Sequence, residues 1–221
     1  MTQKHQESLN ETTIEAIYKT VSPERMGTYL VSCGQDRHRA AQMYLWNAQI
    51  GEAFHVIIQG VEVALRNAIN RALIDQYGSH WWIDLNFLSL ADHDRRSDLE
   101  LVTRRIRNRG LMEINGQIVA GLSFGFWVGM LQPRYNMTIW SKHLRVVFPN
   151  LPEGRSRKSL ARAVGEIAFL RNRISHHEPL LKRDISRDYK LVTEVLEWVC
   201  PSKHSWLRPH CRVPEILRQK P

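Results

Sequence analysis

The chain has 221 residues, 43% of them apolar, so it can bury the core of one domain and is not disordered by composition. Lysine and arginine total 31 against 22 acidic residues, and the formal net charge of +9 predicts affinity for polyanions such as nucleic acid. The three cysteines fit no disulfide framework, and neither a signal-peptide core nor a membrane-spanning apolar run is present. We therefore expect a cytoplasmic protein that does not enter a membrane.

The first third of the sequence predicts a polar lead-in at residues 1–11, a short helix and one long helix. Ser22-Pro23-Glu24 is typical of a helix start, and Gly34 can end that helix. From Asp36 to Tyr77 apolar residues recur at every third or fourth position: Met43, Trp46, Ile50, Phe54, Ile57, Val61, Leu65, Ile69 and Leu73. This spacing predicts a long helix, with glycines that bend, split or end it at Gly51, Gly60 and Gly78.

The middle of the chain predicts three further helices. Asp92 or Asp94 caps the first of them, whose apolar positions are Leu99, Val102 and Ile106. Trp81 and Trp82 lie in a short connection before it, where they either pack in the core or stack on bases. The remaining expectations are a helix end by Gly110, a loop or short hairpin at 110–117, a buried helix at 118–130 carrying Trp127, a helix at 135–147 carrying Trp140 in the core, and a connection at 148–154.

The C-terminal part predicts two helices and a tail. Ser156 or Ser159 starts the first helix, which must end near His177 because Pro179 disfavours the α conformation at the preceding residue. A second helix is predicted at 184–200, and prolines make residues 201–221 read as a mostly irregular tail. No convincing strand pattern occurs, so we expect a single all-α domain over residues 1–221.

Arg171 carries the main chemical signal of the sequence. It falls on the same helical stripe as the apolar residues Leu160, Val164, Ile167 and Ile174. A guanidinium directed toward an apolar face needs a carboxylate or phosphate partner. Glu62 is our first candidate, since it sits among apolar residues of the long helix. A surface pair between Glu62 and Arg66, four residues apart, is the alternative.

His176 follows Arg171 by five residues, which places the two side chains roughly 140° apart around a regular helix. Asn172 and His176 share a face because they are four residues apart. Two arrangements would unite the arginine and the histidine. Either the helix loosens before Pro179, or a symmetric dimer brings the segments of two copies together.

These residue types suit metal-independent cleavage of RNA. A histidine can take the proton of the 2′-OH or protonate the leaving 5′-oxygen, and an arginine can stabilise the developing phosphoryl charge. By spacing alone, an ordinary helix end, whose side chains interact with the helix dipole and solvent, explains the pattern better. Cys200, His204, His210 and Cys211 are poorly spaced for zinc, so we expect no metal and no cofactor.

The segment RNRISHHEPL at 171–180 resembles the Arg-Asn-x-x-x-His signature of the HEPN superfamily, in the version seen in Abi-like (abortive infection) proteins. YLWNAQIGEAFHVIIQGVEVALRNAINRAL at 44–73 and LSFGFWVGML at 122–131 resemble other parts of that family, so the likeness covers most of residues 20–200. On this resemblance Arg171, Asn172 and His176 match the ribonuclease motif, and His177 is the adjacent alternative.

The resemblance implies a HEPN-like helical bundle with additional helices, commonly a homodimer, that cuts RNA in phage defence or as the toxin of a toxin–antitoxin pair. The expected partners are RNA and either an antitoxin protein or a structured RNA. Two alternatives remain. One is a non-catalytic RNA-binding or scaffold protein with the same fold. The other is a DNA-binding regulator, against which the sequence offers no clear helix-turn-helix.

Overall fold

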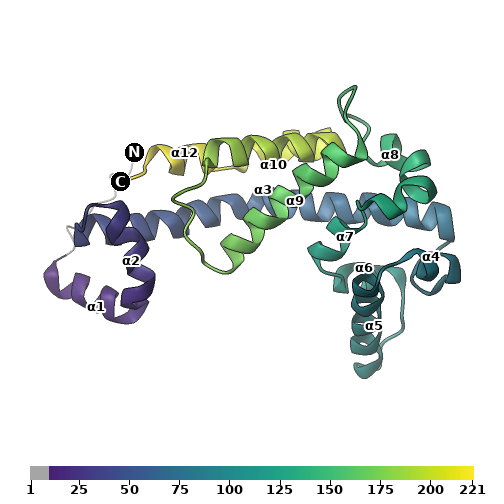
Figure 1. Ribbon diagram of the computed structural model, residues 1–221, viewed down its shortest axis with the longest axis horizontal. Helices are drawn as coiled ribbons and strands as arrows, with labels where there is room; N and C mark the ends of the chain where they lie inside the picture. The colour runs from purple at the N-terminus through teal and green to yellow at the C-terminus, as the bar shows by residue number, and fades with distance from the viewer. Residues whose placement is uncertain (1–9) are drawn as a thin grey trace.

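The computed structural model describes residues 10–221, and every regular element in that range is a helix (Figure 1). The molecule is built on α3 (Arg37–Tyr77), one helix of 41 residues and about 60 Å that runs along its length. Two short helices pack at the N-terminal end of α3, a group of mostly short helices gathers at its C-terminal end, and the C-terminal helices lie along its N-terminal half and middle. The all-α expectation is confirmed.

The N-terminal elements begin and end at side chains that satisfy free backbone groups. Asn10 accepts from the backbone N–H of Thr13 and starts α1 (Glu11–Val21), and Ser22 accepts from that of Arg25 and starts α2 (Pro23–Ser32). Asp36 caps α3, which covers the predicted range up to Tyr77, and Gly78 ends it with a φ of 85°. Of the expected lead-in, residues 1–9 lie outside the described part, and Glu11 already belongs to α1.

Neither glycine inside α3 splits the helix. A Cβ on Gly60 would lie 2.6 Å from Leu207 Cδ1, so this glycine allows another helix to approach the backbone closely.

The group at the C-terminal end of α3 comprises η1 (Trp81–Ile83), α4 (Leu85–Leu90), α5 (His93–Asn108), α6 (Asn115–Gly121), α7 (Phe124–Gly129), η2 (Pro133–Tyr135), the π-helical turn η3 (Asn136–Trp140) and α8 (Ser141–Val147).

The C-terminal helices lie against α3. α9 (Arg157–Ser175) begins in a capping box between Ser156 and Ser159 and crosses α3 at an angle. α10 (Ile185–Val199) starts at Asp184 and makes the most extensive contact with α3. It is followed by α11 (Pro201–Leu207), η4 (Arg208–His210) and α12 (Val213–Arg218).

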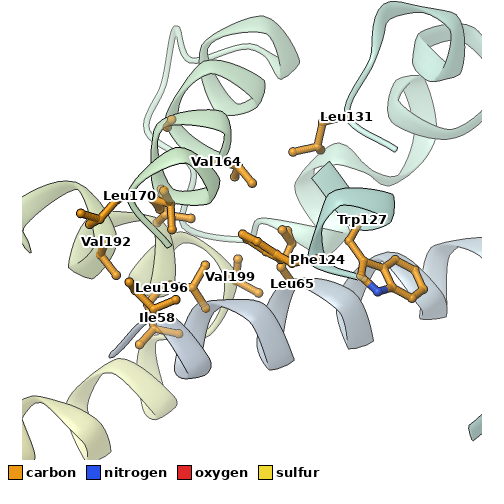
Figure 2. Close-up of a cluster of buried hydrophobic side chains, with 14 of the residues drawn as sticks. Ile58, Leu65, Phe124, Trp127, Leu131, Val164, Leu170, Val192, Leu196 and Val199 are labelled. Atoms are coloured by element: carbon orange, nitrogen blue, oxygen red, sulfur yellow. The ribbon is translucent and has the colours of Figure 1, made fainter. Parts of the chain in front are cut away.

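The core forms where α7, α9 and α10 meet the apolar face of α3 (Figure 2). Val164 and Leu170 of α9 are fully buried there, and each such side chain contributes about 1.5–3 kcal/mol. All the tryptophans of the middle region are also buried, which excludes base stacking for them: Trp81, Trp82, Trp127 and Trp140. One core thus fixes α9 on α3.

Two sequence expectations were wrong, and for a third the structure selects between two alternatives. The helix predicted at 118–130 is two helices, because Leu122 and Ser123 are extended and the Ser123 side chain caps α7. Of the two alternatives for residues 110–117, the loop holds for 110–114 and the hairpin does not, because α6 starts at Asn115. The tail at 201–221 is mostly helical, because Pro201, Pro209 and Pro214 occupy first-turn positions of α11, η4 and α12, where the lost N–H is harmless. None of the helices within 10–221 is long and apolar enough to cross a bilayer.

Candidate functional site

Two histidines occupy the C-terminal end of α9, which closes in a Schellman motif. The N–H of His176, the C-cap, still donates to Asn172 O at 2.9 Å, so the helix is regular up to this residue. The N–H groups of His177 and Glu178 then donate to Ile174 O at 3.0 Å and Arg173 O at 2.8 Å. His177 consequently has a φ of 55°, a left-handed conformation that glycine usually provides.

Arg171 is held by the partner that the sequence predicted. Its Nε donates to Glu62 Oε1 at 2.9 Å, across 109 positions of sequence, and so joins α9 to α3. The Arg171 side chain is 40% exposed and that of Glu62 is 25% exposed. The pair is therefore anchored on the core side while the rest of the guanidinium faces solvent, where a phosphate can approach it.

Asn172 and Arg66 differ in their relation to this pair. Asn172 is exposed, and its Oδ1 accepts from Arg171 Nη1 at a long 3.5 Å. Arg66 is not ion-paired with Glu62 anywhere in the described chain, and its Nε is buried without a hydrogen-bond partner. Burial lowers the pKa of Lys203, and the charge of nearby Arg66 lowers it further. Arg66 thus belongs to a basic group with α11 and does not form the alternative pair.

His176 does not meet Arg171 within one chain. Because its N–H keeps the helical hydrogen bond, the helix does not loosen there, and the two side chains leave α9 roughly 140° apart. His176 is exposed on the outward face that Asn172 shares. The loosened helix end, which would unite Arg171 and His176 within one copy, is therefore not present in this conformation.

A cavity of about 550 Å³ opens beside the end of α9, between the N-terminal half of α3 and residues 174–180. His177 lines it, whereas His176 does not. The walls also include the side chains of Tyr44, Glu52 and His55 from α3. A mostly apolar hollow of this size with a few polar groups at its rim suits part of a nucleotide.

Sequence reasoning missed His55 as a member of this region. The signal was present, because polar residues recur at helical spacing along one stripe of the otherwise apolar α3: Glu52, His55, Gln59, Glu62 and Arg66. Only Glu62 and Arg66 were singled out, since they adjoin the predicted arginine partner. The stripe runs from the cavity to the Arg171 pair, so both belong to one surface.

The described residues include no group of potential metal ligands. Within residues 10–221, no three His, Cys, Asp or Glu side chains are grouped so that they would hold an ion. Cys200, His204, His210 and Cys211 do not form such a group. The arrangement offers proton carriers and a guanidinium, which are the groups that phosphodiester cleavage by the 2′-OH requires.

No family model, curated protein or solved structure matches the chain.

Proposed function

We propose that the protein is a metal-independent endoribonuclease with a HEPN-like fold. The observation that carries the proposal is the Arg171–Glu62 pair, which fixes one edge of the guanidinium against α3 while the Arg171 side chain stays 40% exposed. A positioned arginine of this kind stabilises the charge that develops on a transferring phosphoryl group. Resemblance of the 171–178 segment to the HEPN signature supports the same reading.

The reaction needs only groups that the chain supplies. A histidine removes the proton of the 2′-OH, and the 2′-oxygen attacks the adjacent phosphorus. The bond to the 5′-oxygen breaks, and that oxygen takes a proton from a protonated imidazole. The products are a 2′,3′-cyclic phosphate and a 5′-hydroxyl. Arg171 neutralises the charge on the non-bridging oxygens, and Asn172, adjacent to it, binds or orients the substrate.

A homodimer unites Arg171 of one copy with His176 of the other. The outward face of α9 supports this assembly, because Phe169, Asn172 and His176 follow one another at spacings of three and four residues. Phe169 is 53% exposed at the N-terminal end of this row, with the guanidinium groups of Arg173 and Arg183 over its ring. An exposed aromatic side chain on the face that carries His176 is typical of a surface that another subunit covers.

His177 has a separate role in this proposal. It lines the cavity with His55 and Glu52, where the nucleoside next to the cleaved bond would lie. The biological setting is proposed from the family resemblance alone. It is a cytoplasmic role in phage defence or as a toxin, with RNA as substrate and an antitoxin protein or structured RNA as regulator.

A non-catalytic RNA-binding protein is the second candidate. One observation favours it: a single copy does not bring Arg171 and His176 together, so a chain that stays monomeric would hold RNA without cutting it.

The deciding experiment is cleavage of RNA by purified protein in excess EDTA, with analysis of the product ends. Cyclic phosphate ends, lost in Arg171→Ala and His176→Ala but retained in His93→Ala, would support the ribonuclease. His93 is a suitable control because its side chain is 92% exposed and lies on α5. RNA binding without any cutting by the wild type would favour the second candidate.

A further inference from the structure

A second hollow, of about 340 Å³, lies between α7 and the N-terminal half of α9, where the side chain of Arg95 reaches it from α5. Its ionisable lining residues, among those described, are Arg95 and Arg157. We propose that this hollow binds a phosphate group, namely one in the backbone of the RNA whose cleaved bond lies at Arg171. This inference rests on the proposed function and names a further contact of the same substrate.

Arg95 is the first observation that points to an anion. It is only 9% exposed, and its Nε is buried with no hydrogen-bond partner. Its guanidinium packs on the backbone of α7, where a Cβ added to Gly129 would lie 1.7 Å from Nη1. Gly129 is therefore required for this position of the arginine. A buried guanidinium with unused donors is expected to have an acceptor.

Arg157 independently lines the same hollow from the first turn of α9. It donates from Nη1 to Leu131 O, and its Nε is buried without a partner. Gln132 and Gly125 also line the hollow. Two guanidinium groups from different helices thus converge on a space lined by no carboxylate of the described chain. Guanidinium groups suit phosphate, because their paired donors match its oxygens.

Three aspartates lie near Arg95, on α5 and at its start, and do not satisfy it. Asp92 and Asp98 are each 3.8 Å from Nε, and Asp94 is 3.7 Å from Nη2, all beyond hydrogen-bond distance. Asp92 Oδ1 already accepts the backbone N–H of Arg95 at 2.9 Å as the helix cap. Burial raises the pKa of Asp98, and the opposing effect of Arg95 is smaller. The three carboxylates therefore offset the positive charge of Arg95 but leave its side-chain N–H donors without a hydrogen-bond acceptor.

The position of the hollow fits a strand of RNA that reaches Arg171. Arg157 and Arg171 are 14 residues apart, close to four turns of α9, so they project from nearly the same face about 21 Å apart. Small residues lie between them on this side of the helix: Ala161, Gly165 and Ala168. That length equals about six stacked nucleotides at about 3.4 Å each.

The test measures binding without cleavage. Inorganic phosphate and pyrophosphate are titrated against the thermal unfolding of the wild type, and a non-cleavable 2′-O-methyl RNA of twelve nucleotides is titrated by fluorescence anisotropy. Arg157→Gln is compared with Lys158→Gln, which removes the same charge from the neighbouring exposed position outside the hollow. Arg157→Lys keeps the positive charge but loses the paired N–H donors of the guanidinium. Circular dichroism verifies that each variant is folded.

We expect phosphate to raise the Tm of the wild type and of Lys158→Gln but not of Arg157→Gln. For the twelve-nucleotide RNA, Arg157→Gln should weaken binding more than Lys158→Gln and lower the slope of log K against log salt by about one. Arg157→Lys should fall between. The difference between the glutamine variants should vanish for a three-nucleotide RNA, which is too short to reach both arginines.

Failure takes two forms. Equal RNA binding by the two glutamine variants, with no effect of phosphate on the wild type, would overturn the site. Phosphate stabilisation with equal binding of the long RNA would overturn the RNA contact and assign the hollow to a free phosphate-bearing ligand. Neither readout depends on catalysis, so a failed ribonuclease would show itself separately, as intact natural RNA in the EDTA assay.

Discussion

His177, the left-handed residue at the end of α9, can be changed so that the free energy of unfolding rises while the proposed catalytic residues stay in place. His177 has a φ of 55° at the position of the Schellman motif where glycine is preferred. Holding a side-chain-bearing residue in this conformation costs about 1–2 kcal/mol. Glycine costs about 0.5–1 kcal/mol in additional chain entropy on folding. His177→Gly should therefore stabilise the protein by a net amount of about 0.5–1 kcal/mol.

Urea unfolding of His177→Gly beside His177→Ala measures this effect. With a slope of about 2 kcal/mol per molar urea, the glycine variant should unfold about 0.3–0.5 M later than the alanine variant. Alanine is the matched control because it removes the same imidazole and keeps the strain. The contact from Arg25 Nη1 to the carbonyl of His177, at 3.4 Å, survives in both. Equal midpoints would show that the backbone at this position is not strained.

The same variants test which histidine carries the proton. His177 lines the cavity but is not the proposed acid or base, so His177→Gly should cleave RNA within about tenfold of the wild type. His176→Ala should lose about 10²–10⁴ in rate. A rate loss of the larger size in both His177 variants, with His176→Ala active, would transfer the catalytic role to His177.

Three further expectations concern the pair, the dimer face and alkaline unfolding. Glu62→Ala should cost at most about 1 kcal/mol in urea unfolding, because the pair is partly exposed, yet lower cleavage about 10–100-fold because Arg171 loses its orientation. A stability loss of several kcal/mol with unchanged activity would refute this. Phe169→Glu should give monomers in light scattering, whereas Leu45→Glu, equally exposed on α3, should leave the assembly intact. Burial raises the pKa of Tyr29 to about 12, so the stability from keeping its phenol neutral is full below pH about 10 and is lost as pH rises toward 12. Tyr29→Phe should remove that part of the decline in alkaline unfolding.

Local capping and apolar spacing predicted the helices wherever these signals act alone. Asp36 and Gly78 bounded α3 correctly, and the stripe on α9 correctly placed Arg171 against Glu62. The sequence did not predict the break in the 118–130 helix. One long apolar helix and two short helices joined by two extended residues have the same pattern of apolar positions. Which side chains line a cavity also depends on crossing angles between distant helices, so His55 was missed.

The hollow at Arg95 could not be predicted from the sequence. Gly129 lies inside the segment predicted as one buried helix, and nothing in the sequence shows that it provides room for a guanidinium from α5. Such a contact joins residues far apart in sequence and leaves no periodic signal. The Schellman geometry at His177 was hidden for another reason, since a glycine would have revealed it and histidine does not.

Mixing two inactive variants tests the composite ribonuclease site most directly. Arg171→Ala and His176→Ala are each assayed alone on RNA in EDTA, then unfolded together, refolded and assayed again. If each site takes its arginine from one copy and its histidine from the other, half of the dimers are mixed and each has one intact site. The mixture should then regain about a quarter of wild-type cleavage. A mixture as inactive as either variant, with wild-type protein active in parallel, would contradict a site shared between copies.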